Sequence, residues 1–217
     1  MFENMNLRRP TICLAIILCT LPMLAQSPKV ERTASAPDGV SKDVAAALEN
    51  KGYRLSLADG WTAEVWLAKN PKLASSTGAA ALYPELSNGE FIAVLHLPKG
   101  MSDFRGQAVP PGTYCLRYQL LPQDANHLGV SPNPDFLLAI PIASDTKPDA
   151  VYPLDKLVAL SAKSTGAHAA VIALEAAGDP GTAAFDEQKL LVLTVNITSA
   201  GGKSEPMGII LKGQAAQ

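Results

Sequence analysis

The chain has 217 residues, of which 47% are hydrophobic and 18% are charged, and its formal net charge at pH 7 is −2. This length can bury a full hydrophobic core in one or two domains. A charge so close to neutral provides no electrostatic attraction to nucleic acid or to anionic lipid, and we therefore expect no nucleic-acid partner.

The N-terminus has the pattern of a secretory signal peptide. Arg8 and Arg9 precede an apolar run over residues 11–24, and the small residue Ala25 stands before a polar stretch. The run is too short to cross a bilayer comfortably, because a spanning helix needs about 20 apolar residues. We expect residues 1–25 to be a signal peptide of bacterial type, which leaves a secreted or periplasmic product without a membrane span. An uncleaved anchor is the alternative.

The next segments change from a polar lead-in to a strand pattern. Residues 26–40 are polar and contain proline and glycine, which predicts a flexible lead-in. Ser41 can cap a short helix that continues to Asn50, with Gly52 just beyond its end. Apolar residues then recur at every second position, as in half-buried strands. The strands expected in this half of the chain cover residues 53–57, 61–68, 90–97 and 113–121.

The second half continues this pattern. Residues 136–142 are apolar at almost every position, which indicates a central strand. Pro153 suits the first turn of a helix that extends to Ser164. Three more strands are expected at residues 169–174, 189–197 and 207–212.

About eight strands and two short helices make a mainly-β fold. Several strands follow one another without helices between them, which favours antiparallel pairing. We predict one domain over residues 41–217, an antiparallel two-sheet sandwich of jelly-roll or immunoglobulin-like type with one or two short helices. A single sheet with helices on one face is the alternative.

Cysteine content sets a further limit. Cys13 and Cys19 lie in the predicted signal peptide, so Cys115 is the one cysteine left and no internal disulfide can form. Cys115 falls in the middle of an expected strand, where a lone cysteine most often acts as a small buried hydrophobe. We predict a buried and unreactive thiol.

The long polar loop between the fourth and fifth expected strands is the main candidate site. It concentrates Asp124, Asn126, His127 and Asp135, and polar residues on a loop held by a rigid sheet are a common setting for binding. His127 with a carboxylate could bind a metal ion or act as a base, and Arg117 could reach a carboxylate such as Asp135. The alternative is that these residues only stabilise turns.

Residues 104–145 carry the clearest resemblance to other proteins. Their motifs, PPGTYCLRY, then NHLGVSP, then DF, are similar to those of a set of uncharacterised exported bacterial β-sandwich proteins. The segment VPPGTYCLRYQL also resembles, more weakly, the strand entry of transthyretin-like carboxypeptidase regulatory modules. The resemblance implies a secreted β fold and no particular activity. Within this block, His127 and Asp135 are the preferred site residues.

These observations predict an exported soluble protein of the cell envelope. We expect a non-catalytic module that binds a small molecule, a glycan or an envelope protein, and no nucleotide-binding motif points to a cofactor. The first alternative is a metal-binding protein or enzyme that uses Asp124, His127 and Asp135. The second is a structural subunit that pairs its sheet edges with a partner.

Overall fold

The computed structural model describes residues 27–33, 35–72, 81–121, 131–199 and 201–214. Ten strands of this part of the chain form one antiparallel sheet in the order β1-β2-β3-β4-β7-β8-β9-β12-β11-β10, and β5 pairs with β6 in a small second sheet. The mainly-β antiparallel class is therefore confirmed. The strands are β1 (Lys29–Thr33), β2 (Gly52–Ser56), β3 (Thr62–Leu67), β4 (Phe91–Leu97), β5 (Met101–Ser102), β6 (Ala108–Val109), β7 (Gly112–Leu120), β8 (Asp135–Pro141), β9 (Ala170–Glu175), β10 (Thr182–Phe185), β11 (Leu191–Thr198) and β12 (Ser204–Lys212).

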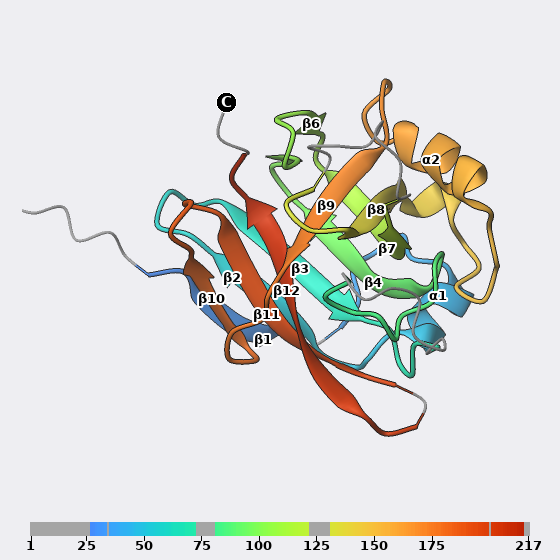
Figure 1. Ribbon diagram of the computed structural model, residues 1–217, viewed down its shortest axis with the longest axis horizontal. Coiled ribbons are helices and arrows are strands. Elements are labelled where there is room, and N and C mark those ends of the chain that lie inside the picture. The colour runs from blue at the N-terminus through green and yellow to red at the C-terminus, as the bar shows by residue number, and fades with distance from the viewer. Residues whose placement is uncertain (1–26, 34, 73–80, 122–130, 200, 215–217) are drawn as a thin grey trace, which may run out of the picture.

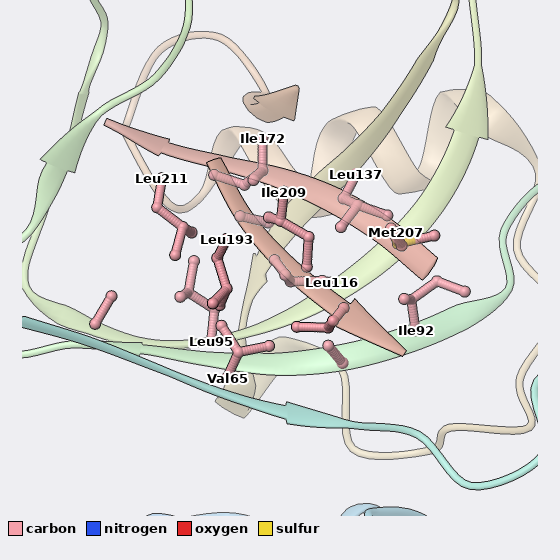
Figure 2. Packing of buried hydrophobic residues seen from close by; sticks show 14 of the residues in the cluster. Val65, Ile92, Leu95, Leu116, Leu137, Ile172, Leu193, Met207, Ile209 and Leu211 are labelled. Atoms are coloured by element: carbon pink, nitrogen blue, oxygen red, sulfur yellow. The ribbon is translucent and has the colours of Figure 1, made fainter. Parts of the chain in front are cut away.

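The large sheet curls around one hydrophobic core. Its edge strands β1 and β10 come into contact, and its two halves face each other as the sheets of a sandwich do (Figure 1). Leu116, Leu137, Ile172, Leu193 and Ile209 come from five different strands, are fully buried and point toward one another (Figure 2). Each such side chain contributes roughly 1.5–3 kcal/mol when it leaves water, so this inner face is the main source of stability.

Two helices cover apolar patches on the outer face. Helix α1 (Lys42–Ala47) packs through Val44 on a cluster with Trp66, and α2 (Leu154–Ala162) packs through Leu157 on β8 and β9. The predicted cap of α1 is confirmed, because the Ser41 hydroxyl accepts a hydrogen bond of 3.2 Å from the Val44 amide. No helix within the described residues is long and apolar enough to cross a membrane.

Helix α1 ends three residues earlier than the sequence predicts. At Leu48 the backbone turns to an extended conformation, and this residue forms an isolated bridge with Ala68 next to β3. The Leu48 side chain is almost completely buried. Pairing with the sheet therefore replaces the last helical turn.

The sequence did not predict the two polar edge strands, β1 and β10. The flexible lead-in predicted for residues 26–40 is wrong for Lys29–Thr33, which form β1 and pair with β2 along their whole length. All five residues are exposed or half-buried, so their sequence has no apolar alternation to reveal a strand. The exposed edge strand β10 was missed for the same reason. Such strands are held largely by backbone hydrogen bonds, which propensity patterns do not report.

The antiparallel order gives the sheet two distinct ends. At one end β3 begins at Thr62, β4 finishes at Leu97 and β12 finishes at Lys212, and we call it the Lys212 end. At the other end β3 finishes at Leu67 and β8 begins at Asp135, and we call it the Asp135 end. The loop that the sequence analysis favoured leads into the Asp135 end.

Candidate functional site

Three of the predicted site residues lie outside the described part of the chain. Asp124, Asn126 and His127 all fall within residues 122–130. The described residues on either side are joined, because the Leu121 amide donates a hydrogen bond of 2.8 Å to the Pro134 carbonyl. The binding roles of these three side chains therefore stay predictions.

Asp135 is described, and both oxygens of its carboxylate accept hydrogen bonds from protein donors. It is completely buried and accepts hydrogen bonds from the amides of Leu82 and Tyr83, at 2.7 and 2.9 Å, and from the Tyr118 hydroxyl at 2.6 Å. Burial, followed by the hydrogen bond to Asp135, raises the pKa of Tyr118, so this hydroxyl stays a donor. The arrangement ties the segment at Leu82 to the sheet and favours a structural role for Asp135.

Tyr83 extends this buried network to the other half of the sheet. Its hydroxyl donates to the Glu175 carbonyl at 2.8 Å and accepts from the Gly208 amide at 2.9 Å. Burial raises the pKa of Tyr83 to about 12. The Asp135 end is therefore closed by a polar network whose members satisfy one another.

Arg117 does not meet Asp135. The two residues lie on opposite faces of the sheet, and the Arg117 guanidinium instead forms a two-pronged pair with Asp145, with N–O distances of 2.6 and 2.9 Å. Its remaining N–H groups donate to three backbone carbonyls, those of Gly89, Lys147 and Ala150. All five N–H groups are thus used, and the pairing with Asp135 that the sequence suggested is wrong.

Cys115 lies beside this ion pair on the same outer face. Its side chain is completely buried in the cluster under α1, as predicted, and the Sγ atom contacts the Asp145 carbonyl oxygen at 3.2 Å. Burial raises the pKa of the thiol strongly.

We therefore expect native protein to react with a thiol reagent at least 100-fold more slowly than protein unfolded in denaturant, since reagent has no access to the thiolate until the fold opens. The measurement is the labelling rate followed by mass spectrometry. Equal, rapid labelling of the two states would contradict the burial of Cys115.

The Lys212 end holds a groove that the sequence analysis did not predict. It has a volume of about 820 Å³ and lies where the ends of β3, β4, β10 and β12 meet the β5–β6 hairpin. This size falls within the range of roughly 300–1,000 Å³ that is typical of small-molecule sites. Its described lining comprises Trp61, Lys99, Gly100, Met101, Ser102, Ala108, Val109, Pro110, Pro111, Phe185, Gln188, Lys189, Lys212, Gly213 and Gln214.

The floor of the groove is built by a close contact between two turns. Trp61 is buried and donates a hydrogen bond of 2.9 Å from Nε1 to the Gly100 carbonyl. Gly100 has φ +69°, and a Cβ atom there would lie 2.6 Å from the Val109 carbonyl oxygen. Only glycine fits this position, because a side chain would force the hairpin wall away from the sheet.

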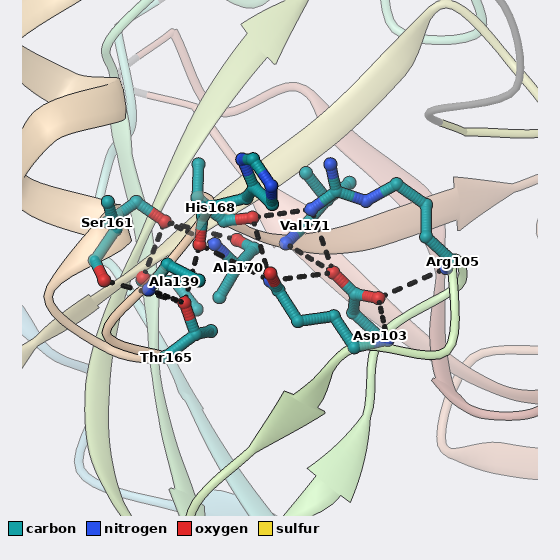
Figure 3. Close-up of polar contacts among 12 residues, drawn as sticks. Asp103, Arg105, Ala139, Ser161, Thr165, His168, Ala170 and Val171 are labelled. Carbon is teal, nitrogen blue, oxygen red and sulfur yellow. Dashed lines mark hydrogen bonds and ion pairs between the residues drawn. The ribbon is translucent and has the colours of Figure 1, made fainter.

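Asp103 braces the hairpin that forms one wall. Its buried carboxylate accepts hydrogen bonds from the amides of Arg105 and Gln107, at 3.1 and 2.9 Å, and an ion pair from the Arg105 guanidinium at 3.0 Å. Arg105 also donates to the Ala169 carbonyl at 2.5 Å. Figure 3 shows Asp103 and Arg105 next to Val171, at the start of β9. The wall is therefore fixed to the large sheet before any ligand arrives.

Positive charge gathers in the groove. Lys99, Lys189 and Lys212 line it, whereas no carboxylate is among its described lining residues. Lys212 is held in place by Asp59 at 2.9 Å and by the Trp61 ring, whose centroid lies 5.6 Å from the Lys212 nitrogen. The Trp61 amide, then Lys212, lower the pKa of Asp59, so this carboxylate stays charged and neutralises one of the three lysines. Lys99 and Lys189 are exposed and form no ion pair or side-chain hydrogen bond with the described residues, although Lys99 lies close enough to Asp59 to help lower the pKa of that carboxyl.

The sequence gives little sign of this groove because its residues come from separate turns and strand ends. Trp61, Lys99, Phe185 and Lys212 are spread over more than 150 positions, and each is unremarkable in its own segment. Lys189 has φ +63° in the tight turn from Asp186 to Leu190, a left-handed conformation that nothing in the sequence indicates for a lysine.

Comparison with known proteins assigns no relationship to this chain. No protein-family model, no curated protein and no solved structure matches it. The resemblance of residues 104–145 to exported β-sandwich proteins therefore stays a prediction, and the geometry of the groove is the basis for a functional assignment.

Proposed function

We propose that this protein is an exported, non-catalytic binding module of the cell envelope that binds a small molecule in the groove at the Lys212 end. The observation that carries the proposal is a pair of unpartnered lysines, Lys99 and Lys189, beside exposed apolar side chains in one depression. Cationic groups that lack an internal partner are available to a ligand, and a few polar groups among apolar ones are typical of small-molecule sites. Export is supported by the N-terminal sequence pattern.

The shape of the groove supports a small molecule over a protein or a long glycan. One wall of this open groove is braced by Asp103 and another is formed by the end of β12, so the depression is bounded on two sides. Protein partners usually cover about 800 Å² of a surface, which requires a broader contact area. A site that is formed in advance also loses little ordering entropy on binding.

The proposal is tested by thermal denaturation against a panel of small anions, cations and neutral compounds. We expect at least one class to raise the Tm of the wild type by several degrees, since a ligand at 100 times its Kd stabilises by about 2.7 kcal/mol. Ala108→Trp, which fills the groove from an exposed lining position, should abolish this shift. The matched control, Ala176→Trp, places the same bulk at the Asp135 end and should retain it.

Export is checked separately by sequencing the N-terminus of protein recovered from outside the cytoplasm, which should begin near Gln26. Binding that survives in Ala108→Trp would place the ligand elsewhere and contradict the groove assignment. A product that keeps Met1 and stays in the membrane would contradict export.

A further inference from the structure

The groove has apolar side chains beside Lys99 and Lys189. Phe185 is 48% exposed, although most large hydrophobic side chains among the described residues are buried. Met101 of the hairpin and the exposed Pro110 and Pro111 line the same groove. An apolar surface that stays in contact with water beside charged groups is a common mark of a binding site.

The electrostatic setting distinguishes this groove from the rest of the protein. The chain as a whole has a formal net charge of −2, yet the described lining of the groove contains three lysines and no acid. Asp59 pairs with Lys212 and also interacts with Lys99, so the three lysines and this one carboxylate together have an excess of two positive charges. A local charge opposite in sign to that of the whole molecule attracts anions to this one place.

We propose, on the basis of the function proposed above, that the ligand is a small amphipathic organic anion, a carboxylate or phosphate monoester attached to an apolar body. Lys99 and Lys189 bind the anionic group, while Phe185, Met101 and the two prolines pack against the body. Lys212 is a positioning residue, because its contacts with Asp59 and Trp61 hold the floor of the groove in place.

Other ligand chemistries fit the groove less well. An inorganic anion would satisfy the lysines and leave the apolar wall in water. A neutral sugar would leave both free ammonium groups without a partner, so nothing would offset their partial desolvation. An amphipathic cation would meet like charge in a partly enclosed site. Only a molecule with both an anionic and an apolar part uses both surfaces.

The test is a calorimetric titration of the full mature chain with five compounds that share or lack these parts. Octanoate and octyl phosphate represent the two anionic groups, octanol removes the charge, octyltrimethylammonium reverses it, and inorganic phosphate removes the apolar body, all below micelle-forming concentrations. We expect one or both octyl anions to bind at least 10-fold more tightly than the other three compounds. Which of the two binds more tightly identifies the anionic group.

Paired variants assign the contacts. Lys99→Gln/Lys189→Gln should weaken the octyl anion at least 10-fold and remove its advantage over octanol. The control Lys42→Gln/Lys51→Gln changes the charge equally at exposed positions near the Asp135 end and should bind as the wild type does. Phe185→Ser should weaken octyl compounds and leave inorganic phosphate unchanged. Trp61 fluorescence provides a second readout, since Trp66 is buried under α1 on the outer face.

Each contrary result has one meaning. If octanol or the octyl cation binds as tightly as the anions and Ala108→Trp blocks it, the anionic class is wrong while the groove remains a binding site. If the octyl anions do not bind, or bind equally in the Lys99/Lys189 double variant, the inference is also wrong. If the protein sediments with phosphatidylglycerol vesicles but does not bind the free compounds, its partner is a membrane surface and the proposal of a small-molecule ligand is wrong.

Discussion

Arg117→Met is expected to lower the free energy of unfolding by about 3–5 kcal/mol, because it leaves Asp145 as an uncompensated buried charge. Both members of the pair are only 1% exposed. The substitution also removes the donors to the carbonyls of Gly89, Lys147 and Ala150, which this guanidinium joins to β7. Chemical denaturation, monitored by circular dichroism, measures the loss.

A surface ion pair provides the matched control. Lys203 contacts Glu85 and Glu205, and it is 51% exposed. Lys203→Met should change the free energy of unfolding by less than about 1 kcal/mol, because water screens exposed pairs and ordering long side chains costs entropy. A loss in Arg117→Met no greater than that in Lys203→Met would show that the buried clamp does not stabilise the fold.

The location of Arg117 also explains a limit of sequence reasoning. The alternation along residues 113–121 places Arg117 on the face opposite Tyr118, but the sequence suggested a carboxylate such as Asp135 as its partner. Its actual partner, Asp145, lies 28 positions away in the chain and follows the turn after β8. Which acid meets a buried base depends on loop geometry that periodicity does not contain.

Eight strands were predictable, because a strand buried on one face has a side-chain period of two and a central strand such as β8 is apolar at nearly every position. Four strands were not predicted: β1 and β10, whose exposed residues follow no such period, and β5 and β6, which have two residues each. The way one continuous sheet curls on itself was not predicted either. Curling depends on the twist accumulated over ten strands and not on any single segment.

The groove was less predictable than the fold. Lys99, Lys189 and Lys212 lie close together only because antiparallel pairing brings the ends of distant strands to the same end of the sheet. The sequence instead indicated residues 122–135, where carboxylate, amide and imidazole side chains are concentrated. Of that segment the described acid, Asp135, proves to be occupied by backbone and tyrosine donors.

Asp135→Asn gives the second large effect and separates two readings of this residue. An amide can accept fewer of the three hydrogen bonds and presents an N–H group toward at least one backbone donor, so one or both amides of Leu82 and Tyr83 lose their partner. We expect the free energy of unfolding to fall by about 2–4 kcal/mol, since hydrogen bonds to a charged acceptor contribute about 1.5–3 kcal/mol each. Tyr118→Phe removes a single donor and should cost less, about 1–2 kcal/mol.

Measuring stability with and without a chelator distinguishes a structural role of the Asp135 carboxylate from a metal-binding role. If Asp135 joins the segment at Leu82 to the sheet, Asp135→Asn lowers the free energy of unfolding by the same amount with and without a chelator. The control is Asp155→Asn, at an exposed position in the first turn of α2, which should lower the free energy of unfolding by less than about 1 kcal/mol. A metal ion held by Asp124, His127 and Asp135 predicts the reverse: wild type alone loses stability when chelator is added. Because three donors already point at this buried carboxylate, a metal ion would compete with the hydrogen bonds that hold the Asp135 end together. The stability of the wild type should therefore be insensitive to chelator.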